Sequence, residues 1–508
     1  MIDTKALREK VLDLAIRGKL VPQDPNDEPA SVLLKKIREQ KKQMVKDGEL
    51  KAKNIKNDTI IFKGDDNLHY EQFADATVKC IEDEIPFEVP EGWEWARLVN
   101  VTSKIIDGSH NPPKASKKRT DYIMASSKNI NNDNLCNLDD VRYISKEEYE
   151  KENARTQVTI NDILLTAVAT LGRSCVFMGN VKNLTFQRSV SIITTFMKPE
   201  YLKYYFDASY FQKHIENNST GNAQKGFYLN QLEKVLVCMP PYSEQQRIAD
   251  CIERYNAIIG TLETDIKSFK DTISVVKSKI LDLAIRGQLV PQDPNDELAS
   301  VLLDRIRAEK EELIKAGKIK RDKKESVIFK GEDNSYYEKV ENNIKNIADK
   351  IPFEIPESWT FVRLEDVLDY EQPTPYIVKS IDYKDDYQTP VLTAGKSFII
   401  GYTNETYGIK TELPVIIFDD FTTDSKYVDF PFKVKSSAMK ILTAEEKLIN
   451  IKFAYYAMQV VECDNYNHKR YWISEFSKKL IPLPPKAEQA KIVKAIEELY
   501  KYIEQTLS

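Results

Sequence analysis

A long internal repeat is the feature of this chain that most restricts its fold. Residues 12–34, LDLAIRGKLVPQDPNDEPASVLL, return at 281–303 with two changes. The repeat continues in FKGDDN and FKGEDN, in IPFEVPEGW and IPFEIPESW, and in PPYSEQQRI and PPKAEQAKI. The segments 101–220 and 367–466 between these motifs cannot be aligned with each other. We therefore expect two nearly identical frames that hold two different inserts, with function in the difference.

The composition restricts the class of protein. Of the chain's 508 residues, 42% are hydrophobic and 30% are charged. A membrane span needs about 20 consecutive apolar residues, and no apolar run in the sequence approaches that length. Its start, MIDTKALREK, does not resemble a signal peptide. Six cysteines and four histidines are scattered without the spacing of a disulfide framework or a zinc site. We expect a cytoplasmic protein with no membrane contact and no metal.

The charge distribution bears on nucleic-acid binding. A net charge of -5 argues mildly against it, because phosphate binding favours a basic surface. Two stretches are basic in spite of this overall charge. The net charge is +4 over residues 104–128 and +3 over residues 426–440. Each lies inside one insert. They predict DNA contact, and the alternative is that they are solvated loops with incidental lysines.

A heptad pattern predicts one long helix over 243–286. Apolar or seam-compatible residues alternate in steps of four and three, which is typical of a coiled coil. The seam consists of Ile248, Ile252, Tyr255, Ile259, Leu262, Ile266, Phe269, Ile273, Val276, Ile280 and Leu283. Ser243 is expected to cap this helix and Gly287 to end it. At about 1.5 Å per residue the helix would be a rod of roughly 65 Å.

The repeat supplies a partner for this rod from both ends of the chain. A shift of 244 residues places Ile492, Ile496, Leu499 and Ile503 on the first half of the seam. A shift of 269 residues places Leu7, Val11 and Leu14 on its second half. We therefore expect two long antiparallel coiled-coil helices, related by a pseudo-two-fold axis, and termini that meet so that the chain is circularly closed. The alternative is that the terminal helices pack on separate domains.

Short β-branched runs predict that both inserts are α/β with strand-rich cores. These runs begin at Asp162, Cys175, Ser189, Thr389 and Leu413. Helices are expected at 201–217 and 451–461. Each insert opens with an IPFE segment whose prolines favour extended backbone, and Trp93 or Trp359 is expected to hold the insert on its rod.

Polar and basic residues that could contact DNA gather in loops of the inserts, where Arg and Lys match guanine edges and phosphates, and Asn and Gln match adenine. In the first insert we select Ser109, His110, Lys114, Lys117, Lys118, Arg119, Lys128, Asn129, Thr170, Arg173, Gln187 and Arg188. In the second we select Gln372, Thr374, Tyr376, Lys396, Thr422, Thr423, Lys426, Lys469, Arg470 and Tyr471. Each one taken singly also fits an ordinary turn or surface role.

Three motifs resemble catalytic signatures and are incomplete. Residues 111–114, NPPK, resemble the [DN]PP[YF] signature of amino-methyltransferases, but Lys114 cannot stack on a base as an aromatic ring does. Gly395-Lys396-Ser397 ends like a phosphate-binding loop, but Pro390 occupies the position of its first glycine. The acidic pair Asp419-Asp420 has no third partner in nuclease spacing. We predict that the chain is not an enzyme and binds no cofactor itself.

The duplicated LDLAIRG, IPFE(V/I)PE(G/S)W and PPxxEQxxI motifs, together with two unlike inserts, resemble the DNA-specificity subunit of bacterial type I restriction-modification enzymes. The resemblance covers essentially the whole chain. It implies that each insert is a target recognition domain for one half of an asymmetric bipartite DNA site, and that the rods fix the spacer. It also implies two methyltransferase subunits that bind S-adenosylmethionine and modify adenine, and two ATP- and magnesium-dependent restriction subunits.

On this interpretation the chain divides into seven segments. The first four are an N-terminal helical frame (1–50), a connector (51–84), target recognition domain 1 (85–242) and a central coiled-coil helix (243–286). The last three are a repeated helix with connector (287–350), target recognition domain 2 (351–485) and a C-terminal coiled-coil helix (486–508). The repeated helices at 30–46 and 299–315, capped by Ser31 and Ser300, are expected to dock the partner subunits.

Two other functions stay open from the sequence. A coiled-coil adaptor could present two variable domains to protein partners, and sequence-dependent DNA binding would separate it from a specificity subunit. A self-contained methyltransferase or nuclease would require activity from the chain alone.

Overall fold

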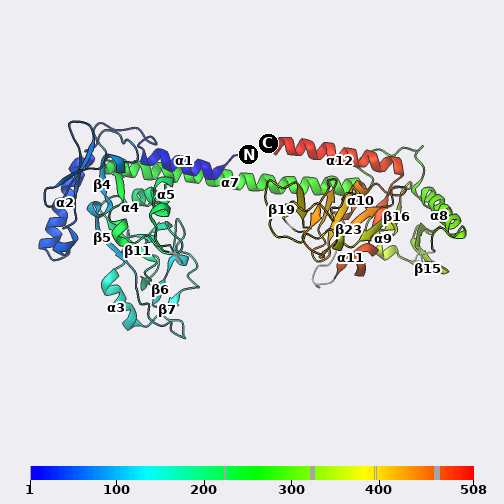
Figure 1. Ribbon diagram of the computed structural model, residues 1–508, viewed down its shortest axis with the longest axis horizontal. Helices are drawn as coiled ribbons and strands as arrows, with labels where there is room; N and C mark the ends of the chain where they lie inside the picture. Colours follow the sequence, from blue (N-terminus) through cyan, green and yellow to red (C-terminus); the bar gives the residue numbers. More distant parts are fainter. Residues whose placement is uncertain are drawn as a thin grey trace. The chain divides into compact units, whose positions relative to one another are not determined.

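The structure is a computed structural model that describes residues 2–221, 225–320, 326–393, 395, 397–462 and 470–507. It divides into two compact units (Figure 1). We call Ile2–Ile266 the first unit and Lys267–Ser508 the second unit. Two predicted DNA contacts, Lys396 and Lys469, lie outside the described residues. Among the described helices, none combines the length and apolar content needed to cross a membrane.

The long central helix is confirmed as α7 (Tyr242–Ile285), within one residue of its predicted bounds. Gly287 ends it as expected, because its φ of +69° lets the amide of Gln288 donate to the Leu283 carbonyl at 2.8 Å. The predicted cap is wrong. Ser243 lies inside the helix, and its hydroxyl donates to Asp27 Oδ1 at 2.5 Å.

Each terminal helix packs along the part of α7 that belongs to its own unit. In the first unit, Arg8 of α1 (Thr4–Ile16) pairs with Glu263 at 3.0 Å, while the Ile16 carbonyl accepts from Cys238, just before α7. In the second unit, Lys277 of α7 pairs at 3.0 Å with Glu504 of α12 (Lys486–Leu507). In the first unit these contacts make the terminal helix antiparallel to α7.

The predicted seam is buried only in part. Ile248 and Ile252 in the first unit, and Ile492 and Ile496 in the second, are fully buried because they also join the cores of the domains. Five other residues of the predicted seam are 37–43% exposed: Leu7, Tyr255, Phe269, Val276 and Leu499. Where only α7 and one terminal helix pack together, each seam side chain is covered on one side and remains partly exposed.

The other helices are shorter. They are α2 (Ala30–Lys46), α3 (Lys146–Thr156), α4 (Pro199–Asp207), α5 (Ser209–Asn218) and α6 (Leu229–Leu232) in the first unit and α8 (Ala299–Lys315), α9 (Leu364–Val367), α10 (Ile451–Met458) and α11 (Tyr471–Ser474) in the second. The predicted bounds of α2 and α8 are confirmed, but Ser31 and Ser300 are not their caps. The cap positions are Pro29 and Leu298, and Ala30 instead donates its amide to the Gly92 carbonyl at 2.8 Å.

Each connector folds into a three-stranded antiparallel sheet. The strands are β1 (Ile60–Lys63), β2 (His69–Gln72) and β3 (Val78–Cys80) in the first unit and β13 (Ser326–Lys330), β14 (Tyr336–Val340) and β15 (Asn343–Asn346) in the second. A two-stranded ladder then joins the entry to the return of each insert. It pairs β4 (Glu94–Arg97) with β12 (Leu236–Met239), and β16 (Thr360–Arg363) with β24 (Leu480–Leu483).

The first insert contains two sheets. Its four-stranded antiparallel sheet has the order β5-β11-β8-β9, formed by Thr102–Asp107, Val190–Thr195, Ile163–Thr166 and Ser174–Val176. Its three-stranded sheet has the order β10-β6-β7, formed by Leu184–Phe186, Ile123–Ala125 and Arg142–Tyr143. In this second sheet β6 pairs parallel with β10 and antiparallel with β7.

The second insert repeats this topology. Its four-stranded antiparallel sheet has the order β17-β23-β20-β21, formed by Leu368–Glu371, Met439–Ala444, Val415–Asp419 and Ser425–Val428. Its three-stranded sheet has the order β19-β18-β22, formed by Ile399–Thr403, Thr389–Leu392 and Lys433–Val434, with β18 parallel to β22 and antiparallel to β19. The predicted strand-rich α/β cores are confirmed. The two inserts, whose sequences cannot be aligned, thus share one strand order.

The two tryptophans of the IPFE segments hold each insert on its long helix, as predicted. The indole nitrogen of Trp93 donates to Glu244 Oε2 of α7 at 2.9 Å. The indole nitrogen of Trp359 donates to Glu488 Oε2 of α12, also at 2.9 Å. Both tryptophans are 5% exposed. The same buried contact therefore recurs in both units.

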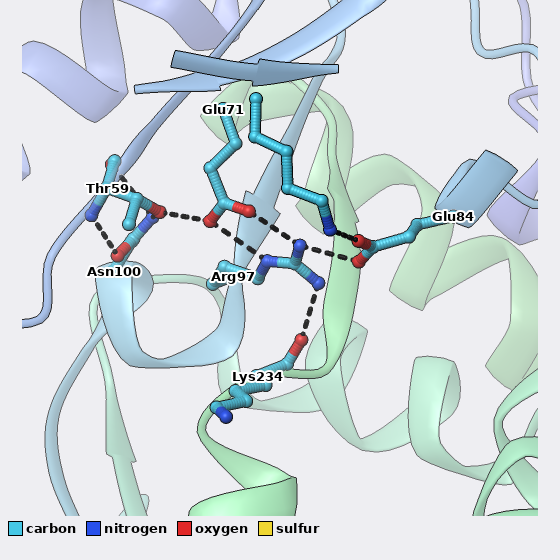
Figure 2. A network of polar contacts seen from close by, with 7 residues as sticks. Thr59, Glu71, Glu84, Arg97, Asn100 and Lys234 are labelled. Carbon is cyan, nitrogen blue, oxygen red and sulfur yellow. Dashed lines mark hydrogen bonds and ion pairs between the residues drawn. The ribbon is translucent and has the colours of Figure 1, made fainter. Parts of the chain in front are cut away.

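Arg97 joins several elements of the first unit (Figure 2). Its guanidinium pairs with Glu71 of β2 at 2.6 Å and with Glu84 at 2.7 Å, and donates to the Lys234 carbonyl at 2.9 Å. Although burial acts in the opposite direction, hydrogen bonds from Arg97 hold the pKa of Glu71 below its usual range. The connector sheet, the entry strand and the return segment are thus held together by one cation.

Candidate nucleic-acid interface

In the first insert, the structure brings two predicted DNA-contact segments together. The amide of Ser109 donates to the Phe186 carbonyl at 2.7 Å, and the amide of Arg188 donates to the Ser109 carbonyl at 2.9 Å. A side chain at Gly108 would meet the carbonyl oxygens of Phe186 and Gln187 at 2.2–2.3 Å, so this close approach requires glycine. The loop after β5 and the turn before β11 therefore form one surface.

His110 extends from this surface. It is exposed, and its Nε2 lies 2.5 Å from Asp107 Oδ2. Arg155 of α3 also reaches the same aspartate at 3.4 Å and donates to the Gly108 carbonyl. Our sequence reasoning missed Arg155, because nothing in the local pattern of a polar helix indicates which loop it reaches.

Two predicted contacts in this insert are buried, which corrects their assignment to DNA. Asn129 is fully buried, and its amide donates to the Asn137 and Asp140 carbonyls at 3.0 and 3.1 Å. Ser109 is only 3% exposed. Buried polar groups are normally satisfied inside the protein, so both hold loops in place. Their exposed neighbour Lys128 stays available as a cation, although it pairs with Asp140 at 2.6 Å.

Most of the basic side chains in the stretch 104–128 are exposed. Lys114, Lys117, Lys118 and Arg119 are all exposed. Lys104 is an exception, because it pairs with the fully buried Asp162 at 3.0 Å and contributes to folding. The positive charge predicted for this stretch therefore lies on the surface, except for that of Lys104.

The turn between β8 and β9 carries two further candidates. Arg173 is exposed, and its amide donates to Thr166 Oγ1 at 2.9 Å. Thr170 is half-buried in the same turn. Gly172 adopts a φ of +81° there, which permits the tight reversal.

In the second insert, the candidates within the described residues lie on three segments of the chain, the second of which continues into β21 with Lys426. Gln372 and Thr374 follow β17 and are exposed, while Tyr376 beside them is half-buried. Burial, reinforced by the nearby Glu371 carboxylate, raises the pKa of Tyr376, which keeps its hydroxyl a neutral donor.

A second segment is the turn after β20. Asp419 Oδ1 accepts from the amides of Phe421 and Thr422 at 2.8 and 3.1 Å. Thr422 is exposed and Thr423, with a φ of +62°, is half-buried. This side-chain-to-backbone pattern is typical of an Asx turn, which presents the two threonines from a fixed loop.

The third segment, 470–472, lies against that turn. Tyr471 donates its amide to the Asp420 carbonyl at 3.1 Å, and Arg470 before it is exposed. Tyr471 is 1% exposed, so its assignment to direct DNA contact is corrected.

The charge predicted for 426–440 is mostly internal. Lys433 and Lys440 are buried in ion pairs with Glu405 and Asp420, and only Lys435 is exposed, with Lys426 half-buried. The second insert thus presents fewer basic side chains from this stretch than its sequence indicated.

The described residues contain no group of three or more His, Cys, Asp or Glu side chains that could hold a metal ion. The exposed groups of both inserts are hydrogen-bond donors and cations on loops that the sheets position. Such a set can contact phosphates and base edges.

Comparison with known proteins agrees with this chemistry. The family model described as "Type I restriction modification DNA specificity domain" matches residues 90–268 and 356–508. The specificity subunit of the type I restriction enzyme EcoR124I/EcoR124II of Escherichia coli is 54% identical over 126 residues, which cover 24% of this chain and 31% of that protein. The EcoAI specificity subunit of Escherichia coli is 29% identical over 419 residues, which cover 72% of this chain and 62% of that protein.

The chain thus spans less than two thirds of the length of these two relatives. A solved chain from a structural study of complex assembly and conformational transition of the type I R-M system aligns with 13% identity and a TM-score of 0.48, over 83% of this chain and 93% of that one. The family model matches more than half of the sequence, with one match for each insert. The chain therefore belongs to the DNA-specificity subunits of type I restriction-modification systems.

Proposed function

We propose that the two inserts are target recognition domains, each of which reads one half of an asymmetric bipartite DNA site. The observation that carries this proposal is that both inserts have the same strand order, while the loops after equivalent strands carry different side chains. The loop after β5 presents His110 and the loop after β17 presents Gln372 and Thr374. Equivalent positions with unlike donors are suited to unlike half-sites.

The division of roles among the residues follows from exposure. The exposed candidates in the first insert are His110, Lys114, Lys117, Lys118, Arg119, Lys128, Arg173 and Arg188. The cations among them suit phosphates, and Arg also suits guanine. In the second insert Gln372, Thr374, Thr422 and Arg470 are exposed.

We also propose that α7 and the two terminal helices act as a ruler between the half-sites. At about 1.5 Å per residue α7 is roughly 65 Å long, which spans at most ~19 base pairs of about 3.4 Å. Equivalent ion pairs support the pseudo-two-fold relation: Arg247–Asp27 in the first unit corresponds to Lys491–Asp296 in the second. The coiled coil, the circular closure and the seven-segment division at the predicted boundaries belong to this proposal.

The partners of this proposal are double-stranded DNA, two methyltransferase subunits and two restriction subunits. S-adenosylmethionine, ATP and magnesium would bind to those partners and not to this chain. The duplicated helices α2 and α8 are proposed to dock them, because a repeated surface suits a partner that is present in two copies. The chain would direct adenine methylation and cleavage without catalysing either.

Single-molecule methylome sequencing of cells with and without this gene tests the function. We expect a bipartite adenine motif that disappears when the gene is deleted, and persistence of every motif would refute the proposal. Exchange of residues 101–233 for those of a relative should change one half of the motif. A mobility shift with the co-expressed methyltransferase subunit separates DNA recognition from an adaptor role, which predicts no sequence-dependent binding.

A further inference from the structure

We infer that Lys440 is a positioning residue for DNA recognition by the second insert, because one buried ammonium group joins the three described segments that carry candidate DNA contacts of this insert. The inference rests on the proposed function and names a specificity determinant for the second half-site. Lys440 itself is 2% exposed on β23 and is not expected to touch DNA.

The first connection is to Gln372. The Lys440 ammonium donates to Gln372 Oε1 at 3.2 Å. An ammonium group can only donate, so Gln372 must turn its carbonyl oxygen inward and its NH2 group away from Lys440. Gln372 is exposed, and the lysine thus orients it as a hydrogen-bond donor. Base-edge acceptors of the major groove, such as guanine O6 and N7 or thymine O4, match a group held in this way.

The second connection is to the turn after β20. Lys440 pairs with Asp420 Oδ2 at 2.9 Å, and the two side chains are 2% and 3% exposed. A buried carboxylate is stable only with a partner, so this pair fixes the start of the turn. Asp420 directly follows Asp419, whose side chain accepts from the Thr422 amide at 3.1 Å. A shift of Asp420 would therefore move Thr422 as well.

The third connection runs from Asp420 to the segment at 470–472. Asp420 Oδ1 accepts from the Trp472 amide at 3.0 Å, and its carbonyl accepts from the Tyr471 amide at 3.1 Å. Arg470 precedes these anchored residues and is exposed. The same carboxylate thus sets where Arg470 leaves the domain.

A matched buried lysine lacks these connections. The side chain of Lys433 is 1% exposed, and its ammonium group pairs with Glu405 at 3.1 Å. It also donates to the Tyr407 and Gly408 carbonyls at 2.7 and 3.2 Å. None of these partners belongs to the segments that hold Gln372, Thr422 or Arg470. Lys433→Met therefore removes a comparable buried ion pair that contacts neither Gln372 nor Asp420.

The experiment uses the full chain in complex with its methyltransferase subunit. Binding is measured to a duplex with the bipartite sequence methylated in cells, and to duplexes with one base pair changed in either half. Discrimination is the ratio of the affinities for the original and the changed duplex. Lys440→Met should lower this ratio by roughly tenfold for changes in the second half-site, which is the effect of losing one well-oriented base contact. The ratio for changes in the first half-site should stay the same. Amide hydrogen exchange of the full chain should become faster at 421–424 and 471–474.

A double variant guards against simple loss of folding. Lys440→Met with Asp420→Asn leaves no unpaired buried carboxylate and keeps an acceptor for Trp472. It should melt near the wild-type temperature and still lose discrimination at the second half-site. Lys433→Met should keep discrimination at both half-sites.

Several outcomes would overturn the inference. They are unchanged discrimination in either Lys440 variant, equal losses at both half-sites, an equal loss in Lys433→Met, or unchanged amide exchange. If the wild-type complex itself shows no sequence preference, the proposed function fails and the inference fails with it.

Discussion

The two units hold their repeated frames by equivalent contacts but hold their candidate DNA-binding loops by contacts that are only partly the same. In the first insert, backbone hydrogen bonds join the Ser109 loop to the turn at Arg188. In the second, the Val378 amide makes the equivalent backbone bond to the Val434 carbonyl, and a buried ion pair between Lys440 and Asp420 additionally holds the turn after β20. Backbone bonds tolerate many side chains, whereas an ion pair requires two particular residues. One topology can thus be adapted to different surfaces by changing which contacts hold its loops.

The largest difference expected between the units concerns the arginine of the entry strand. Arg97 holds two carboxylates, Glu71 and Glu84, whereas Arg363 pairs with Glu338 and has Lys350 where the first unit has Glu84. Arg97→Met should lower the free energy of unfolding by about 3–5 kcal/mol, because it leaves buried Glu71 without a cation. Arg363→Met should cost about 1–3 kcal/mol.

Calorimetry of the full chain checks this prediction. Equal losses for the two arginines would contradict the account of Glu84.

A second difference concerns the polar residue that hydrogen-bonds to the start of each connector sheet. Asn100 of the first unit, which donates to the Thr59 carbonyl at 3.0 Å, corresponds to Asp366 of the second. Burial raises the pKa of Asp366 to about 6. Because this pKa is raised, the protonated form of Asp366 stabilises the folded state. That stabilisation is fully present below about pH 4 and is lost as the pH rises through about 6.

Asp366→Asn should therefore raise the free energy of unfolding by about 2 kcal/mol above about pH 7 and leave it unchanged near pH 4. Urea unfolding at both pH values measures this. Asn100→Asp is the matched control and should destabilise the first unit only at the higher pH. A pH-independent effect of either substitution would contradict the prediction.

The tryptophan contacts should behave alike, because their geometry is the same in both units. Trp93→Phe and Trp359→Phe each remove a donor from a buried carboxylate, Glu244 or Glu488. Each should lower the free energy of unfolding by about 1–2 kcal/mol. Thermal unfolding of the two variants should agree, and a clear inequality would show that the frames are less equivalent than their contacts indicate.

The smallest effect is expected at Ser31 and Ser300, which lie just inside the starts of α2 and α8. Ser31→Ala and Ser300→Ala should change the free energy of unfolding by less than about 0.5 kcal/mol, since neither residue caps its helix. A loss near ~1 kcal/mol would restore the cap assignment. Asp3→Ala is a useful reference, because Asp3 accepts from the Ala6 amide at 3.0 Å.

Much of the fold could be predicted from local patterns. The heptad steps predicted α7 within one residue, and β-branched runs predicted strands β8, β9, β11, β18 and β20. The caps were predicted wrongly because a single serine lies near the start of each of these helices, at Ser31, Ser243 and Ser300, and local sequence does not tell whether it precedes or follows the first helical residue. Only the packing of the preceding chain decides where the helix begins.

The candidate interface was less predictable. Exposed lysines at 114–118 could be selected from composition, but Asn129 and Tyr471 look equally polar in sequence and are buried. Lys433 and Lys440 were counted as surface charge, although their carboxylate partners remove them from the surface. Those partners lie up to 28 residues away in sequence, beyond any local pattern.

The sequence by itself determined the duplication, the long helix, the alternation of the strands and the family to which the chain belongs, because repeats and periodicity are local properties. Only the tertiary structure decided that the two inserts share one strand order and which candidate residues are exposed. Strand order depends on pairings between distant segments, and many sequences satisfy the same alternation of buried and exposed positions. Unlike inserts can therefore adopt one fold, and the side chains they present are settled by packing.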